Sequence, residues 1–523
     1  MGIIPWAFCL AAITTLATAV YRILFHPLSS VPGPKLAALS GLYEFYFDCL
    51  LEGKFIFEIR RLHDVHGPLV RIGPNEVHIS DPDFYEQVQN VTGKLDKDPW
   101  YYAFIGSADA GFGTADAAIH RLRRQAMSRF FSTSAIAKLE ETSREKVLNL
   151  CSKLDVFMKA GHPVNMSNAY RCLTFENVTA YSLPRGFKML DHTDLSKPYD
   201  TQARSIAQLA IWNRHLRFLF PLLLRFSDWY LHLFPRPPEN EMHGFSAIDY
   251  FDSFAKQAAE VVNAAKRSDK SVLDGIVNSE SLPESEKTVD RIAQEARTLA
   301  GAGTETTGSI LDRITYHILS NSSIRGKLLA ELRHFVEGHG PDADILLDYK
   351  SLQDLVYLTA TINEALRLSN SVSGRLPRIS QRSPLTYNEH VLPPGTVISV
   401  NSSDPLTNSA VFPQPMNFDP DRWVTATPEQ KKQMERYFVP FGRGARSCIG
   451  KELALMTLYL TTANFVWRYG QAAKLWETGP EDVNMEHDFF APFARKESQG
   501  VRVLLKDSGG HHGHKEVKAS SAS

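Results

Sequence analysis

A single cysteine, Cys448, stands in a loop whose composition suits metal binding. The loop runs from Phe441 to Gly450, reads FGRGARSCIG, and contains three glycines and two arginines. Glycine has no Cβ and lets the backbone approach a large flat ligand. A neighbouring arginine favours the thiolate form of cysteine, which is the form that binds metal. The free N–H groups of the helix predicted from Lys451 favour it further. The loop therefore indicates a pocket that holds an anionic sulfur against a planar, cationic group.

The pattern Phe-x-x-Gly-x-Arg-x-Cys-x-Gly is complete in these ten residues. A lone free cysteine is usually a small buried hydrophobe, so the surrounding pattern is what distinguishes this one. The pattern resembles the haem-binding loop of the cytochrome P450 family. The resemblance implies that Cys448 is the proximal iron ligand of heme b, bound as a thiolate that favours O–O cleavage. It also implies haem contacts from Phe441, Gly442, Arg446 and Gly450.

A second motif precedes the cysteine loop. Glu364 and Arg367 lie three residues apart in an apolar helical run from Leu355 to Leu368. Taken alone, such a pair is usually a solvated surface pair of little energetic value. The sequence FDPDRW follows at 418–423, and the two segments resemble the Glu-Arg-Arg triad of P450s, which implies a buried cluster of Glu364, Arg367 and Arg422. One carboxylate shared by two guanidiniums would fix the chain that leads to the cysteine loop, which is a structural role.

Small residues interrupt a long helix predicted from about Val289 to Ser320. Residues 300–303 read Ala-Gly-Ala-Gly and are followed by TETT. Glycine weakens a helix, so the cluster serves either close helix packing or space beside a ligand. The segment AGTETT resembles the oxygen-activation motif of P450s. The resemblance implies that the Thr306 hydroxyl hydrogen-bonds dioxygen during its activation and that Glu305 helps to deliver protons through water.

A basic helix is predicted to open at His120, where the sequence reads HRLRRQ. Arg121 and Arg123 could equally belong to a solvated face. P450s have Trp-x-x-x-Arg here, and both side chains contact a haem propionate. In this chain His120 stands in place of the tryptophan and Arg124 in place of the arginine. Histidine can still donate a hydrogen bond to a carboxylate, and its charge state is left open. By the same resemblance Arg378 is a second propionate ligand, suited by its rigid fork.

The remaining pattern predicts a mainly α protein with small β-sheets, of the α+β class, and the resemblance implies the P450 fold. Helical periodicity dominates from about residue 132 to 506. Alternating residues predict strands at 69–72 and 76–80, at 385–399 around a turn at 393–396, and at 501–504. We expect a haem-binding catalytic domain over 41–506 and a disordered tail over 507–523.

The N-terminal segment is uncharged from Ile3 to Tyr21, roughly 19 residues, which is near the span of a bilayer core. Basic residues follow from Arg22, so we expect a single-pass anchor over 1–25 with the bulk of the chain cytoplasmic. A cleaved signal peptide is the alternative, because residues 17–19 read Ala-Thr-Ala, but no basic residue precedes the apolar run. The proline-rich hinge over 26–40 is similar to that of microsomal P450s, which implies the endoplasmic reticulum membrane.

Composition limits the partners. Across 523 residues the net charge is −1, so nucleic acid, which needs a clear basic excess, is not an expected partner. Five widely spaced cysteines suit a reducing compartment rather than a disulfide framework. No GxGxxG motif is present, so electrons must come from a separate protein, and the resemblance implies NADPH-cytochrome P450 reductase. We expect a basic face for this acidic partner, formed by Arg121, Arg123, Arg443, Arg446 and Lys451.

Three segments are expected, by resemblance, to line a substrate pocket: 98–113, with Trp100, Tyr101, Tyr102 and Phe104, then 372–376 and 489–492. Ordinary core packing is the alternative for their aromatic side chains. An aromatic, apolar pocket would suit a small lipophilic molecule. The segments FHPL (25–28) and PGP (32–34) resemble those of fungal P450s of secondary metabolism, which implies a terpenoid, polyketide or indole-derived substrate.

The function implied by the resemblance is O2-dependent hydroxylation or epoxidation by a membrane-anchored haem-thiolate monooxygenase. A haem-thiolate desaturase, isomerase or coupling enzyme is the alternative within the same chemistry. A non-catalytic haem sensor is disfavoured, because a sensor has no use for a proton relay such as Glu305 and Thr306.

Overall fold

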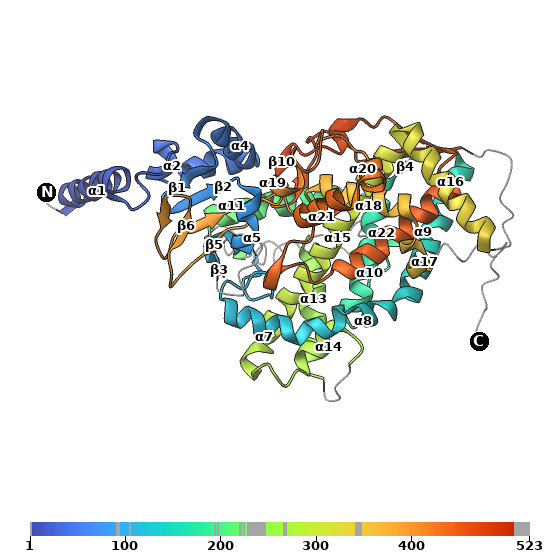
Figure 1. Ribbon diagram of the computed structural model, residues 1–523. Coiled ribbons are helices and arrows are strands. Elements are labelled where there is room, and N and C mark those ends of the chain that lie inside the picture. Colours follow the sequence, from blue (N-terminus) through green and yellow to red (C-terminus); the bar gives the residue numbers. More distant parts are fainter. Residues whose placement is uncertain are drawn as a thin grey trace.

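The computed structural model describes residues 3–89, 95–103, 106–192, 195, 198–218, 222, 225–226, 247–264, 269–339 and 348–506. The predicted tail at 507–523 and Phe104 of the predicted pocket loop lie outside the described residues. Most of the described chain is helical, as the sequence predicts. Figure 1 shows a body of helices at one end and a smaller β-sheet region at the other, from which the N-terminal helix projects.

The long helix α15 (Val289–Ser320) forms the centre of the helical body and has the predicted bounds. The Thr288 side chain accepts a hydrogen bond from the Arg291 N–H and caps its start. Against it pack α10 (Met166–Ser182), α13 (Ala247–Val262), α18 (Val356–Ser369) and α22 (Lys451–Tyr469). These helices and α9 (Glu140–Ala160) enclose the main apolar core. The core therefore fixes α15 relative to the start of α22, which is where the cysteine loop ends.

The remaining helices lie around this core or at the β-sheet end of the molecule (Figure 1). They are α1 (Ile3–Val20), α2 (Lys35–Leu39), α3 (Leu42–Phe45), α4 (Phe55–His66), α5 (Pro82–Gln89), α6 (Pro99–Tyr102), α7 (Ala117–Ser128), α8 (Thr133–Ala137), α11 (Pro198–His215), α14 (Val272–Val277), α16 (Ser322–His339), α17 (Tyr349–Gln353), α19 (Ser403–Leu406), α20 (Asp421–Thr425) and α21 (Pro428–Tyr437). Two π-helical turns, η1 (Tyr21–Phe25) and η2 (Tyr46–Leu50), extend α1 and α3.

The largest sheet has five strands in the order β1-β2-β8-β5-β3. The predicted hairpin is confirmed: β1 (Leu69–Gly73) pairs antiparallel with β2 (Glu76–Ile79). Its other strands are β8 (Val397–Ser399), β5 (Arg378–Ile379) and β3 (Asp96–Lys97). Smaller sheets pair β4 (Val164–Asn165) and β9 (Ala473–Leu475) with β12 (Arg502–Leu505), and β10 (His487–Asp488) with β11 (Pro492–Phe493).

The predicted strand group at 385–399 is divided between two sheets. Strand β6 (Leu385–Tyr387) pairs with β7 (His390–Leu392), whereas β8, beyond the predicted turn, pairs parallel with β2 and antiparallel with β5. The side chains of Ile398 and Val77 are fully buried together in a second apolar core beside this sheet. Burial of Ile398 against β2 accounts for the departure of β8 from its sequence neighbour.

The N-terminal helix is long and apolar enough to cross a membrane over Trp6–Phe25, 20 residues with a mean hydropathy of 1.8. It continues past Arg22 through η1, so the charge does not end it. The Arg22 guanidinium donates to the Leu39 carbonyl at 2.5 Å, and Arg71 of β1 donates to the Arg22 carbonyl at 2.9 Å. In the predicted hinge, a Cβ at Gly33 would lie 2.3 Å from the Arg71 carbonyl oxygen, so only glycine permits this approach.

Candidate active site

The cysteine loop is closed by its own backbone. The Cys448 N–H donates to the Phe441 carbonyl at 2.8 Å, and Gly442 and Gly444 adopt left-handed φ angles of 66° and 70°. Such angles favour glycine, which explains the glycine-rich sequence. The Cys448 residue is exposed, yet enough protein surrounds its sulfur that desolvation raises the pKa of the thiol. The Gly450 N–H and the Arg124 guanidinium act in the opposite direction and favour the thiolate.

The charge that acts on the sulfur comes from Arg124 of α7 and not from the two loop arginines. Arg124 Nη1 donates to the Ser447 carbonyl at 2.7 Å, next to the cysteine. Arg443 instead donates to carbonyls of α21, and Arg446 donates to the Thr114 carbonyl at 2.7 Å. The expectation that the loop's own arginines stabilise the thiolate is therefore corrected: these two hold neighbouring segments to the loop.

A cavity of about 320 Å³ opens beside this loop, between α5, α7 and β5. Its lining has no carboxylate among the described residues. It brings together the predicted propionate ligands His120, Arg124 and Arg378, with Arg121 and the loop residue Arg446. An unbalanced set of cationic donors fits a ligand that carries carboxylates. The residues present therefore fit the carboxylate-bearing edge of a haem, and Cys448 in the adjoining loop would hold its iron.

The imidazole of His120 is neutral in this arrangement. It is only 7% exposed, and burial, followed by repulsion from Arg446, Lys97 and other cations, lowers its pKa to about 3. Burial, with a contribution from Arg378, likewise lowers the pKa of Arg446 to about 10. Arg378 is held by Tyr102 and Gln89, each at 2.7 Å. The lowered pKa favours the neutral imidazole, whose charge state the sequence left open.

Lys97 of β3 is a member of this cationic group that no motif marked. Its ammonium donates to the Phe112 carbonyl at 2.5 Å and lies 3.8 Å from the Phe112 ring centroid and 4.0 Å from that of Tyr102. Burial, and then the nearby Arg378 and Arg446, lower its pKa well below the usual value. A buried lysine with carbonyl and ring partners favours an additional negative charge nearby. The sequence did not predict this position, because it depends on the pairing of β3 with β5, in which Lys97 lies opposite Arg378.

The middle of α15 has two different faces. Thr306 Oγ1 donates to the Ala302 carbonyl at 2.8 Å on an open face of the helix, where Ala302 is exposed. Thr304 Oγ1 makes the equivalent bond to Ala300 at 2.7 Å but is fully buried, on the side that packs against α10. The small residues at 300–303 therefore allow close packing against α10 at one face of α15 and leave the opposite face open, which are the two alternatives that the sequence left open.

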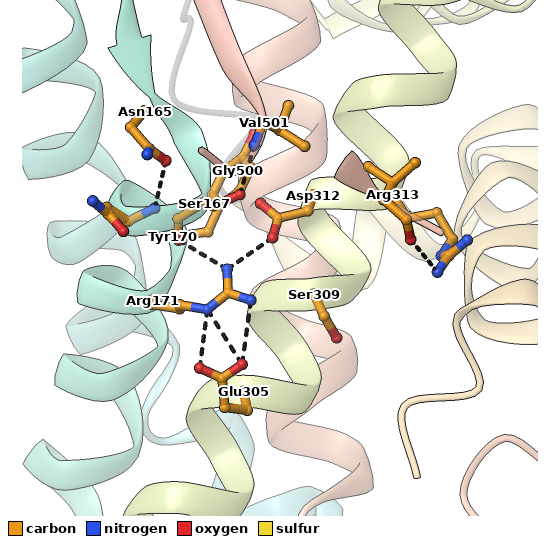
Figure 2. Close-up of polar contacts among 12 residues, drawn as sticks. Asn165, Ser167, Tyr170, Arg171, Glu305, Ser309, Asp312, Arg313, Gly500 and Val501 are labelled. Atoms are coloured by element: carbon orange, nitrogen blue, oxygen red, sulfur yellow. Dashed lines mark hydrogen bonds and ion pairs between the residues drawn. The ribbon is translucent and has the colours of Figure 1, made fainter. Parts of the chain in front are cut away.

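Glu305 does not meet the Thr306 hydroxyl. Figure 2 shows its carboxylate joined to Arg171 of α10, with Arg171 Nε 3.0 Å from Glu305 Oε1. The same guanidinium donates to Asp312 Oδ2 at 2.7 Å and to the Ser167 carbonyl at 3.0 Å. The sequence paired Glu305 with Thr306 as a relay, and the structure places the acid in an ion pair between two helices instead. Arg171 is a further residue that sequence reasoning missed.

The triad residues come together in a buried cluster. Both side chains of the Glu364–Arg367 pair are 0% exposed, with Arg367 Nη2 2.7 Å from Glu364 Oε1. Arg422 Nε reaches the same oxygen at 3.0 Å. Trp423 supplies a donor that was not predicted: its indole N–H lies 2.8 Å from Glu364 Oε2. Arg367 also donates to the Asn417 carbonyl at 3.3 Å, so the cluster holds the segment before the cysteine loop.

The aromatic side chains of the predicted pocket segments form a packed cluster. Rings of Tyr101, Tyr102, Phe112 and Phe490 contact one another edge-on or tilted at 5.2–6.3 Å between centroids. Phe112 is 37% exposed and borders open space. Phe489, by contrast, is buried in an apolar cluster, and Trp100 packs on His215. Phe489, Tyr101 and Tyr102 are thus buried, as in the core alternative, whereas Trp100 is half-buried.

The predicted basic face is smaller than expected. Arg123 is 7% exposed, and its Nε and Nη2 donate to the Glu286 carboxylate at 2.6 and 2.9 Å. Arg446 is engaged with backbone carbonyls. Arg121 and Lys451 remain exposed, and Arg443 is partly so. A helical position alone could not show that Arg123 points inward to an acid far along the chain.

Comparison with known proteins agrees with these features. The family model described as Cytochrome P450 matches residues 41–485. The cytochrome P450 monooxygenase MO6277 of Ascocoryne sarcoides is 34% identical over 93% of this chain and 95% of its own length. The N-acetyltryptophan 6-hydroxylase ivoC of Emericella nidulans is 35% identical over 96% of this chain and 98% of its own. The tryptophan 6-hydroxylase fscE of Fusarium equiseti is 34% identical, with 97% of each chain covered. With its cysteine loop, cationic cavity and buried triad, the chain belongs to the cytochrome P450 family of haem-dependent monooxygenases.

Proposed function

We propose that this protein is a heme b monooxygenase that hydroxylates or epoxidises a small lipophilic secondary metabolite, with electrons from NADPH-cytochrome P450 reductase. One observation carries the proposal: Cys448 ends a glycine-rich loop beside a cavity whose lining contains histidine and arginine but no carboxylate among the described residues. A thiolate and a set of carboxylate-binding cations are what a haem requires of its site. We assign 41–506 as the catalytic domain.

Each site residue has a proposed task. Cys448 would hold the iron, and Phe441, Gly442 and Gly450 would shape the loop around it. His120, Arg124, Arg378 and Arg446, with Lys97, would hold the propionates. The bound haem would supply the activation of O2 and its transfer to the substrate. Glu364, Arg367 and Arg422 would keep the segment before the loop in place.

Two side chains of α15, those of Thr306 and Glu305, would take part in proton delivery. The Thr306 hydroxyl can give up its bond to the Ala302 carbonyl and donate into the open face beside it. Glu305 can pass protons through water only after it leaves Arg171, because a carboxylate in an ion pair is a poor proton carrier. The Asp312 carboxylate offers Arg171 a second partner at 2.7 Å.

The substrate is proposed from the wall of the pocket. Its aromatic members suit a flat or hydrophobic molecule, while the nearby Arg375 turns away and pairs with Glu76 at 2.6 Å. Two relatives are named for hydroxylation of tryptophan or N-acetyltryptophan. Among terpenoid, polyketide and indole-derived compounds, an indole-derived substrate is therefore the first to test.

The protein is proposed to sit in the endoplasmic reticulum membrane with its catalytic domain in the cytoplasm. The helix over Trp6–Phe25 supports a single-pass anchor. In a cell fractionation, the full chain should stay in the membrane pellet after alkaline carbonate extraction. A chain that starts at residue 26 should be released by carbonate.

The activity is tested by deleting the gene, identifying the metabolite that disappears, and reconstituting its formation with purified protein, reductase and NADPH. In ¹⁸O2 the product should carry one labelled oxygen atom. A product formed without label would favour the desaturase or coupling alternative. Haem-containing protein that turns over no metabolite of the deleted strain would contradict the proposal.

A further inference from the structure

Three side chains whose types suit a metal ion meet where the end of α11 packs against the N-terminal segment. Glu44 of α3, Asp48 of η2 and His215 of α11 each bring one ligand atom within 4.8 Å of the other two. Among the residues that the structure describes, no other three histidines, cysteines or acids bring ligand atoms so close. The three side chains are only 6–8% exposed. Two carboxylates and an imidazole are a ligand set that proteins use for zinc.

The imidazole of His215 is directed at this set. Its Nε2 is buried, makes no hydrogen bond and lies 3.5 Å from Asp48 Oδ2. Two ligand atoms of a tetrahedral zinc ion, each bound at about 2.0–2.2 Å, are about 3.4 Å apart. The rings of Phe45 and Trp100 meet the imidazole edge-on, with centroids 5.6 and 5.3 Å away. Aromatic packing therefore holds His215 Nε2 at the spacing from Asp48 that two ligands of one ion would have.

Asp48 has room for a closer positive charge than its neighbours supply. Arg214 Nη1 lies 3.4 Å from Asp48 Oδ2 and 3.8 Å from Glu44 Oε1, whereas close pairs of this kind measure about 2.7–2.9 Å. Arg375 Nη2, by contrast, donates to Glu44 Oε1 at 2.8 Å. A hydrogen bond of this kind fixes the orientation of a ligating carboxylate. The arrangement leaves Asp48 with long contacts and holds Glu44 in place beside it.

The charges around the three ligands favour an added cation. Four carboxylates interact here through ion pairs or through their electrostatic effect on one another: Glu44, Asp48, Glu76 and Asp488. Two guanidiniums, those of Arg214 and Arg375, face them. Burial raises the pKa of Asp488 to about 6, so this carboxyl is mostly ionised at neutral pH. Unbalanced charge is costly to bury, and a divalent cation would bring four negative and two positive charges into balance.

A small polar void beside Asp48 leaves space for one further ligand. Its volume is about 10 Å³, and Arg214, Arg375 and Asp488 also line it. A volume of this size is near the lower limit for one water molecule. Zinc with three protein ligands commonly takes water as its fourth.

We propose that Glu44, Asp48 and His215 bind one zinc ion, which fastens the end of α11 to the α3–η2 segment. The imidazole favours zinc over the oxygen-seeking calcium and magnesium ions. Arg214 need not leave when the ion binds, because its guanidinium is also held 4.1 Å from the ring centroid of Tyr101. No part of the site involves haem, so the proposal goes beyond the proposed function and does not depend on it.

The test is a titration of the full-length holoprotein with zinc chloride, followed by isothermal titration calorimetry. His511, His512 and His514 are first replaced by asparagine in every protein, because a histidine-rich tail can bind zinc itself. This tail-substituted protein should bind one zinc ion per chain. Its thermal unfolding midpoint should rise with zinc concentration, because the ion binds only the folded chain.

Two variants remove one ligand each. His215→Phe keeps a ring between Phe45 and Trp100 but loses Nε2, and Asp48→Asn keeps the shape of the side chain. Each should weaken zinc binding by about a hundredfold or more, since changes outside the ligand set already cost roughly 10- to 100-fold. His162→Asn, at an exposed histidine, is the matched control and should keep the affinity of the tail-substituted protein.

Zinc-edge X-ray absorption of the tail-substituted protein identifies the ligands without any change at the site. It should show nitrogen and oxygen ligands at about 2.0–2.2 Å, including an imidazole, and no sulfur. Failure to bind one zinc ion per chain would overturn the proposal, as would equal affinity in His215→Phe, Asp48→Asn and the control. If neither variant folds, the absorption spectrum decides: a site without a histidine ligand, or with sulfur, would refute the assignment.

Discussion

Arg171 of α10 holds the carboxylate of Glu305 in α15, with Nε 3.0 Å from Oε1 and Nη2 3.2 Å from Oε2. Its third nitrogen, Nη1, donates at 2.7 Å to Asp312, about two helical turns further along α15. The acid of the α15 motif is therefore held in an ion pair between two helices, whereas the Thr306 hydroxyl donates to the Ala302 carbonyl. If Glu305 takes part in proton delivery, as proposed above, Arg171 must first exchange partners.

Loss of Arg171 should destabilise the fold. Arg171→Met leaves the Glu305 and Asp312 carboxylates, 20% and 11% exposed, without their cation. We expect the free energy of unfolding in urea to fall by about 3–5 kcal/mol. The control is Arg144→Met, whose partner Glu141 is 73% exposed, and it should cost less than about 1 kcal/mol. Equal losses in the two variants would contradict a buried role for Arg171.

Thr306→Ala should uncouple electron consumption from product formation. Without the hydroxyl on the open face of α15, protons reach the site less selectively, and we expect product per NADPH to fall by about tenfold or more. Thr304→Ala removes the same group and the same bond to a carbonyl four residues earlier, but from the buried face. Similar uncoupling in both variants would show that the helix, and not the Thr306 hydroxyl, is responsible.

Glu364→Gln should prevent haem incorporation. The change removes one charge that Arg367 and Arg422 share at 2.7 and 3.0 Å, and leaving buried cations unpaired costs about 3–5 kcal/mol. Haem content per chain, from absorbance after purification, should fall to a small fraction of wild type. Asp421→Asn breaks a neighbouring pair with Lys327 that is 42–47% exposed and should leave haem content unchanged. A Glu364→Gln protein with full haem would refute the structural role.

His120 should make haem retention depend on pH. Without a carboxylate beside it, the pKa of His120 is about 3, and bound propionates would raise it. At pH values between the pKa of His120 in the free protein and its pKa in the haem complex, haem binding is accompanied by the uptake of a proton. The affinity for haem therefore increases as the pH falls, by at most about tenfold per pH unit. Haem transfer to apomyoglobin should therefore be slower at pH 6 than at pH 8. In His120→Asn the pH dependence of haem transfer should be weaker. The control His162→Asn changes an exposed histidine and should keep the dependence of wild type. Parallel pH profiles for wild type and both variants would exclude His120 as the source.

Features set by local sequence were predicted well. The bounds of α15 and the start of α22 follow from helical periodicity, and the hairpin at β1–β2 follows from alternation around a Gly-Pro-Asn turn. The closing backbone bond of the cysteine loop depends on residues only seven apart. Such features are decided by neighbours in the chain, which a single sequence displays.

Features set by distant partners were predicted where a family motif marked them, as for Glu364 and Arg422, but not elsewhere. Arg123 faces Glu286, and Arg171 faces Glu305, each more than 130 residues away. Strand β8 leaves its neighbour because Ile398 packs in a core formed by other segments. Lys97 comes close to Arg378, which lines the cationic cavity, through the pairing of β3 with β5. In each case the side chain's environment is created by the fold, so no local pattern could reveal it.

The reduced, carbon-monoxide-bound absorption spectrum tests the central assignment most directly. Wild type and Cys151→Ser, which alters a buried cysteine in the apolar core, should both show the red-shifted Soret band of thiolate-ligated haem. Cys448→Ser should lack that band, because a serine hydroxyl does not supply the thiolate. Retention of the shifted band in Cys448→Ser, or its absence from wild type that contains haem, would contradict the assignment of Cys448 as the iron ligand.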